Sequence, residues 1–119
     1  MKENPILDRS IEFALEVIKL YQWLVNEKRE YVMSKQLLRS GTSIGANLKE
    51  ANMSISRKEF IAKAQIALKE ASESEYWLEL LLRSGYISES QSLMSEIRTI
   101  IRILSAIVIK AKENLKQGT

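Results

Sequence analysis

Polar side chains, most of them small or uncharged, recur four and three residues apart between residues 36 and 54. They are Gln36, Ser40, Ser43, Asn47, Glu50 and Ser54. This spacing places them on one face of a helix. A solvated face has no need to keep such groups in register, so the pattern indicates that this face meets a second partner.

Two kinds of chemistry fit this polar stripe. In the first, the polar groups form a hydrogen-bonded seam inside a bundle or between subunits, because buried polar groups need partners. Its members are Gln36, Arg39, Ser43, Asn47 and Glu50. In the second, Lys35, Arg39 and Lys49 contact phosphates while Gln36 and Asn47 reach bases or sugars. We favour the seam, because polar residues at such positions fix helix register and oligomeric state.

Cationic side chains gather in the first half of the third predicted helix and the second half of the fourth. They are Arg57, Lys58, Lys63, Lys110, Lys112 and Lys116. If these helices are antiparallel, the two basic halves adjoin and form a patch that suits the phosphates of RNA or DNA. Ordinary solvation with intrahelical ion pairs remains the simpler interpretation of such charge runs.

The residues that most enzymes need are missing. The chain contains no His and no Cys, which removes the usual general base, the commonest metal ligands and disulfides. Gly41 and Gly45 lack the Lys-Ser or Lys-Thr pair of a phosphate-binding loop, so they indicate close helix packing instead. Glu70 and Glu73 lack further oxygen ligands for a hard cation. We therefore expect no catalytic residue, no cofactor, no metal site and no enzyme.

The elements that position these groups are amphipathic helices. Beside the polar stripe runs an apolar heptad, Leu37, Gly41, Ile44, Leu48, Ala51 and Ile55. Similar seams are expected on three other helices. The seam of the first helix comprises Leu7, Ile11, Ala14, Ile18, Tyr21 and Val25, and it is widened by Phe13, Val17, Leu20 and Leu24. The seam of the third helix comprises Phe60, Ala64, Ala67, Ala71, Ser74, Leu78 and Leu81. The seam of the fourth helix comprises Leu93, Ile97, Ile100, Leu104, Ile107 and Ala111. Such seams predict core-facing helices.

Capping patterns predict where the helices begin. They are Asn4 before Pro5, Ser34 after a charged connection at 26–30, Ser56 with Glu59, and Ser88 with Gln91. Gly85 supplies a left-handed stop for the third helix. Four amphipathic helices with short connections predict an all-α, up-and-down antiparallel four-helix bundle that spans residues 1–119 as one domain. Trp77 and Tyr76 are expected to be core or interface anchors rather than base-stacking platforms.

Charge and hydropathy favour a cytoplasmic protein. The 18 Lys and Arg exceed the 15 Asp and Glu by three, and the sequence pI is about 9.2, which permits anionic partners without requiring them. The first residues lack an apolar targeting segment, and the apolar stretch 100–109 is interrupted by Arg102 and too short to span a bilayer. We expect no association with a membrane.

Over most of its length the chain resembles the small four-helix-bundle proteins encoded within intervening sequences of bacterial 23S rRNA genes. The matching residues are Gln36, Leu37, Arg39, Ser43, Ile44, Asn47, Glu50, Glu59, Phe60 and the run 62–71. Gly45 and Ala51 stand where Pro and Gly are common in that family. The resemblance implies a homopentamer, with nucleic-acid binding suspected. We expect a non-enzymatic oligomer that binds RNA or DNA; the alternative is a protein-interaction scaffold or an accessory subunit of a nucleic-acid enzyme such as a reverse transcriptase.

Overall fold

Four helices make up the part of the chain that the computed structural model describes, residues 4–88 and 92–118. They are α1 (Pro5–Asn26), α2 (Met33–Asn52), α3 (Arg57–Arg83) and α4 (Leu93–Gly118). No residue in these ranges belongs to a β-strand. The predicted all-α class is therefore confirmed.

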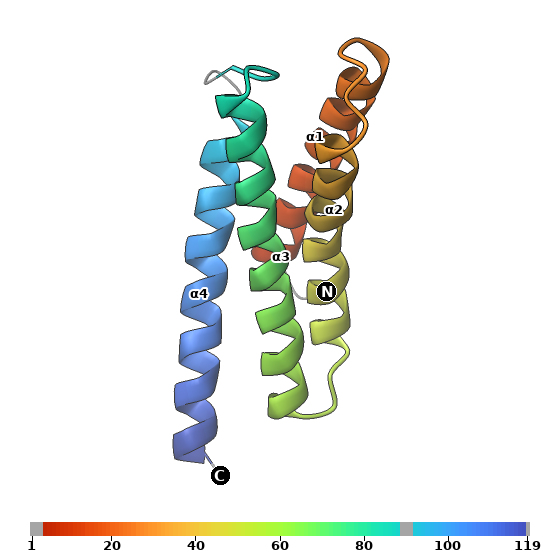
Figure 1. Ribbon diagram of the computed structural model, residues 1–119. Helices are drawn as coiled ribbons and strands as arrows, with labels where there is room; N and C mark the ends of the chain where they lie inside the picture. The colour runs from red at the N-terminus through yellow and green to blue at the C-terminus, as the bar shows by residue number, and fades with distance from the viewer. Residues whose placement is uncertain (1–3, 89–91, 119) are drawn as a thin grey trace.

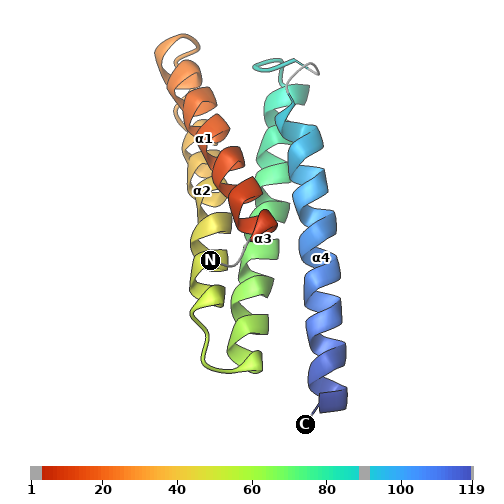
Figure 2. The same cartoon turned by 180° about the vertical axis from the view of Figure 1, so that it is seen from behind.

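The helices lie side by side along a molecule of 53 × 25 × 22 Å (Figures 1 and 2). α2 packs between α1 and α3, and α4 packs against α3 and α1. The α1–α2 connection, the end of α3 and the start of α4 lie at one end of the molecule, and the α2–α3 connection lies at the other (Figure 1). None of the described helices combines the length and the apolar character that crossing a bilayer requires.

Local sequence sets the ends of α1 and α3. The Asn4 side chain accepts a hydrogen bond from the amide of Leu7 at 3.2 Å, and Pro5 occupies the first turn of α1. The Ser56 side chain accepts from the amide of Glu59 at 3.1 Å, as predicted. The Glu59 carboxylate returns to the amide of Ile55 rather than to that of Ser56. α3 starts within one residue of its predicted cap.

Gly85 ends α3 in the left-handed conformation, with φ of +88°, as the sequence predicts. Its amide donates to the carbonyl of Leu82, and the amide of Tyr86 donates to that of Leu81. These two bonds satisfy carbonyls that the end of the helix leaves unpaired. The capping pattern predicted for Ser88 and Gln91 involves Gln91, which lies outside the described residues.

The prediction that Ser34 caps α2 is wrong. α2 begins at Met33, and its N-cap residue, Val32, makes no capping bond with its side chain. The carboxylate of Glu30 instead accepts hydrogen bonds from the amides of Val32, Met33 and Ser34 at 3.1, 3.0 and 2.7 Å. The Ser34 hydroxyl donates back to the carbonyl of Glu30 at 2.8 Å. A buried carboxylate from the connection therefore takes the place of the predicted serine cap.

The core follows the predicted seams with four corrections. At the start of α3, Ile61 is buried where the heptad predicts Phe60, which is only half-buried. The buried face of α1 is centred on Phe13, Val17, Leu20 and Leu24, so Ile11 lies at its edge and is 44% exposed. Ile55 lies beyond the end of α2 and is 95% exposed. In α4, Val108 is buried where the heptad predicts Ile107, and Ile107 lies at the margin of the core. The broad apolar stripes of α1 and α4 leave the centre of contact undecided, because each helix touches two neighbours.

Small residues allow α2 to approach α1 closely, as the glycines predict. A Cβ placed on Gly41 would lie 3.1 Å from both methyl groups of Val17. A Cβ on Gly45 would meet only Ser10, at 3.8 Å, and Leu7, at 4.0 Å. The close approach at Gly41 therefore depends on the missing side chain.

Candidate nucleic-acid interface

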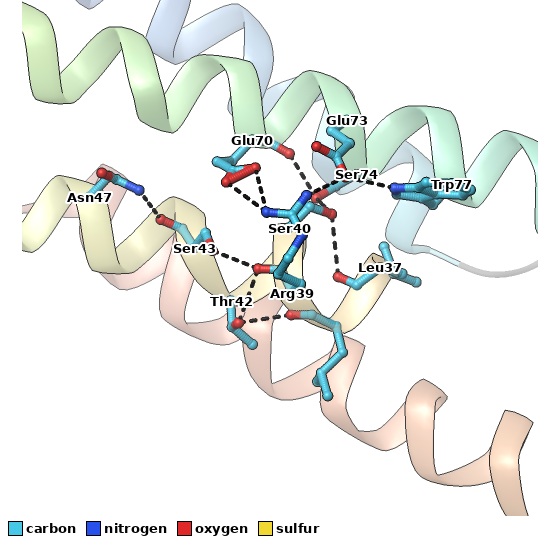
Figure 3. Close-up of polar contacts among 11 residues, drawn as sticks. Leu37, Arg39, Ser40, Thr42, Ser43, Asn47, Glu70, Glu73, Ser74 and Trp77 are labelled. Atoms are coloured by element: carbon cyan, nitrogen blue, oxygen red, sulfur yellow. Dashed lines mark hydrogen bonds and ion pairs between the residues drawn. The ribbon is translucent and has the colours of Figure 1, made fainter. Parts of the chain in front are cut away.

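The polar stripe of α2 lies along the contact between α2 and α3 (Figure 3). Its most buried member is Ser40, whose hydroxyl lies 2.8 Å from the hydroxyl of Ser74 on α3. Both side chains are fully buried, and Ser74 also donates to the carbonyl of Glu70. The two serines satisfy each other between helices that approach closely.

Arg39 joins the two helices at the surface above this serine pair. Its guanidinium donates to both carboxylate oxygens of Glu70, at 3.2 and 3.3 Å, and to Glu73 (Figure 3). The indole of Trp77 donates to the same Glu73 carboxylate at 2.9 Å. The hydrogen bond from Arg39, followed by that from Trp77, lowers the pKa of Glu73, and the bond to Glu73 raises the pKa of Arg39. Arg39 thus keeps its charge, but the carboxylates of Glu70 and Glu73 balance it and occupy its donors, which leaves it poorly suited to a phosphate.

The remaining members of the stripe differ in their contacts. Ser43 donates to the carbonyl of Arg39 at 2.6 Å, and Asn47 donates to the carbonyl of Ser43 at 2.9 Å, so both bond the backbone of their own helix. Glu50 pairs with Lys63 of α3 at 2.6 Å. In the described part of the chain, the half-buried side chain of Gln36 makes no hydrogen bond. Of the five predicted seam members, only Arg39 and Glu50 therefore reach α3 within the described chain.

The six basic residues singled out in the sequence lie at one end of the molecule. Arg57, Lys58 and Lys63 occupy the first two turns of α3, and the lysines at 110, 112 and 116 lie in the last part of α4. These two segments meet at the end that holds the α2–α3 connection (Figures 1 and 2). The chain therefore brings the two basic halves together.

Only one of these six cations is neutralised by a neighbour. The hydrogen bond to Glu50, with its charge, raises the pKa of Lys63. Within residues 4–88 and 92–118, the other five cations form no ion pair. The acidic residues at the same end, Glu50, Glu59 and Glu113, are fewer than the six cations, so this end carries net positive charge.

The unpaired lysines of α4 do not all face the same way. Successive residues of a helix are rotated by about 100°, so Lys110 and Lys112 lie about 200° apart around α4. Lys116 follows Lys112 by one turn and shares its side. Lys110 faces the start of α3, where it lines a surface hollow together with Arg57. Of the α4 lysines, Lys110 thus lies at the hollow, whereas Lys112 and Lys116 lie on the opposite side of α4.

The hollow itself is a feature that the sequence does not predict. It has a volume of about 500 Å³ and lies between the start of α3 and the end of α4. Its lining includes Ile55, Arg57, Phe60, Ile107, Lys110 and Asn114. The seams expected from the sequence include Ile55, Phe60 and Ile107. Two of these predicted core residues, Ile55 and Phe60, fall near helix ends, which is the signal that could have suggested an exposed apolar surface here.

The fold and this end of the molecule define an all-α, four-helix protein with a basic tip. Residues 2–106 match the family of the 23S rRNA-intervening sequence protein. That range covers most of the 119 residues, so the chain belongs to this family, as the resemblance predicts. The matched range ends before Ile107, Lys110 and Asn114, so the α4 side of the hollow lies outside it.

A solved structure shows the same fold. It is a protein with unknown function from the S23 ribosomal protein family of Bacteroides thetaiotaomicron. The two sequences are 53% identical, the similarity covers 87% of this chain and 97% of the other, and the TM-score is 0.85. No curated protein matches the chain.

Proposed function

We propose that the protein is a non-enzymatic, cytoplasmic, oligomeric nucleic-acid-binding protein, built as an up-and-down antiparallel four-helix bundle. The observation that carries the proposal is the set of five unpaired cations at one end of the molecule, where α3 begins and α4 ends. Cations that lack carboxylate partners attract a polyanion and release its counterions on binding. The positions of the helix connections support the antiparallel arrangement (Figure 1).

Self-association would repeat the basic end around the assembly. Ile11 and Leu15 of α1 are 44% and 47% exposed and lie one turn apart, which gives α1 an apolar outer face. Exposed apolar faces of this kind support protein contacts. The stoichiometry of five rests on the resemblance to the family. The outer face of α1 also supports the alternative function, a scaffold or accessory subunit of a nucleic-acid enzyme such as a reverse transcriptase.

The test is a titration of labelled structured RNA at low and at moderate salt. The variant Lys58→Glu, Lys116→Glu reverses two unpaired cations that do not line the hollow. We expect it to bind RNA at least about tenfold more weakly at low salt, since each phosphate contact contributes through counterion release. The native protein should lose affinity steeply as salt rises.

The matched control is Lys19→Glu, Lys28→Glu, which makes the same change of charge toward the opposite end of the molecule. We expect this control to bind RNA nearly as the native protein does. Equal weakening in the two variants would mean that net charge, and not the basic end, governs binding. Absence of binding by the native protein at low salt would favour the protein-interaction function.

A further inference from the structure

The hollow at the basic end combines an exposed apolar floor with two cations. Ile55 is 95% exposed, and the ring of Phe60 is only half-buried. Arg57 and Lys110 line the same hollow from α3 and α4, and within the described residues neither forms an ion pair. Its volume of about 500 Å³ lies within the range of roughly 300–1,000 Å³ of small-molecule sites.

The hollow exists because α1 does not reach this end of the molecule. Arg9, near the start of α1, pairs with Glu96 of α4. Lys110 lies fourteen residues farther along α4, which is about 21 Å at the rise of a helix. In Figure 2, α3 and α4 extend past the start of α1. The apolar side chains there consequently have no covering helix from the described chain.

We propose that this hollow binds an unpaired base of single-stranded RNA, which rests on the nucleic-acid binding proposed above. The base packs on the ring of Phe60 and on Ile55, and the adjoining phosphates lie on Arg57 and Lys110. Stacking of bases on aromatic rings beside cationic grooves is how single strands are held without sequence preference. The side chains of Ser56 and Asn114, which also line the hollow, offer hydrogen-bonding groups to the base edge and the 2′-hydroxyl.

The chemistry of this end favours a single strand over other anions. In a duplex the bases are stacked inside, so only phosphates would reach the site and the apolar floor would remain uncovered. An acidic peptide would neutralise Arg57 and Lys110, but the further unpaired cations on α3 and α4 extend the positive surface beyond one short segment. A flexible polyanion with exposed flat rings matches both the apolar floor and the extended charge.

The experiment compares a short labelled RNA strand of mixed sequence with the same strand annealed to its complement. The variant Ile55→Ser removes an apolar side chain that is almost fully exposed, so the fold does not depend on it. We expect Ile55→Ser and Phe60→Leu each to weaken single-strand binding, the latter by about tenfold, with duplex binding unchanged. Phe60→Tyr keeps the ring and should retain the affinity. The control Met53→Ser removes another exposed apolar side chain of the same connection, one that does not line the hollow.

Three outcomes would overturn the proposal. If Ile55→Ser weakens single-strand and duplex binding equally, or if neither hollow variant weakens binding, no unpaired base is held in the hollow. The proposed nucleic-acid binding would then stand without this site. Lack of binding to either RNA would remove both. If an amphipathic peptide rich in Glu and Leu binds in an Ile55-dependent manner while the single strand does not, the hollow is a protein-docking site.

Discussion

The substitution Glu30→Gln tests the unexpected cap of α2. The Glu30 carboxylate is 7% exposed and accepts hydrogen bonds from three backbone amides at the start of the helix. These amides have no partner within the helix, since the first turn has none to offer. A glutamine side chain keeps one of the two acceptor oxygens of Glu30. In place of the other oxygen it has an NH₂ group, which cannot accept a hydrogen bond from a backbone amide. The change therefore removes the charge and at least one of the three bonds.

The expected cost follows from the strength of these bonds. A hydrogen bond to a charged group contributes roughly 1.5–3 kcal/mol, so Glu30→Gln should lower the free energy of unfolding by about 2 kcal/mol. For a chain of this length, that corresponds to a fall in Tm of roughly 8 °C. Thermal unfolding followed by circular dichroism measures it. The matched control is Glu27→Gln, the same substitution at an exposed position of the same connection.

The loss should also depend on pH. Burial of the Glu30 carboxylate is the largest single influence and raises its pKa, but the amides of Met33, Ser34 and Val32 together outweigh it, so the pKa lies below its ordinary value of 4.5. A carboxylate with a lowered pKa stabilises the fold fully above its unfolded pKa and loses this effect as the pH falls through the folded pKa. The difference in stability between native protein and Glu30→Gln should therefore begin to shrink as the pH falls below the ordinary value of 4.5, and should vanish once the pH has fallen through the lowered pKa of the folded state. An equal Tm for both at pH 7, or a difference that persists unchanged into acid, would refute the role of the cap.

Three further predictions concern helix packing and assembly. Gly45→Ala should raise the free energy of unfolding by about 0.5–1 kcal/mol, because alanine favours the helix and its methyl group fits. Gly41→Ala should gain less stability or lose some, since its methyl group would lie 3.1 Å from a valine of α1. Urea unfolding of both variants measures the difference, and equal gains would contradict the close approach. Ala67→Leu should destabilise by roughly 1–3 kcal/mol at a fully buried site, whereas the same substitution at the exposed Ala62 of the same helix should not. Light scattering should give several times the 13.7 kDa chain mass for the native protein, and a native monomer would end the idea of self-association.

The sequence predicts well what local chemistry decides. Ser56 and Gly85 mark the ends of α3 because a hydroxyl cap and a left-handed glycine act within a few residues. The alanine seam of α3 is buried as predicted, since its heptad spacing admits only one inward face. Glu30 escaped prediction because it reaches the amides of α2 from two residues before the N-cap, where the usual capping residues are not expected.

The positions of whole helices relative to each other are beyond what periodicity can give. A heptad identifies the face of a helix that packs, but it does not fix where along a neighbour the helix begins. The offset between α1 and the α3–α4 pair decides that Ile55, Phe60 and Ile107 lie at an open end instead of in a core. The same offset leaves Arg57 and Lys110 without carboxylates from α1, whose acidic side chains lie higher on the bundle. The exposed apolar floor and the unpaired charge therefore share one structural cause, and a change that extended α1 toward this end would remove both together.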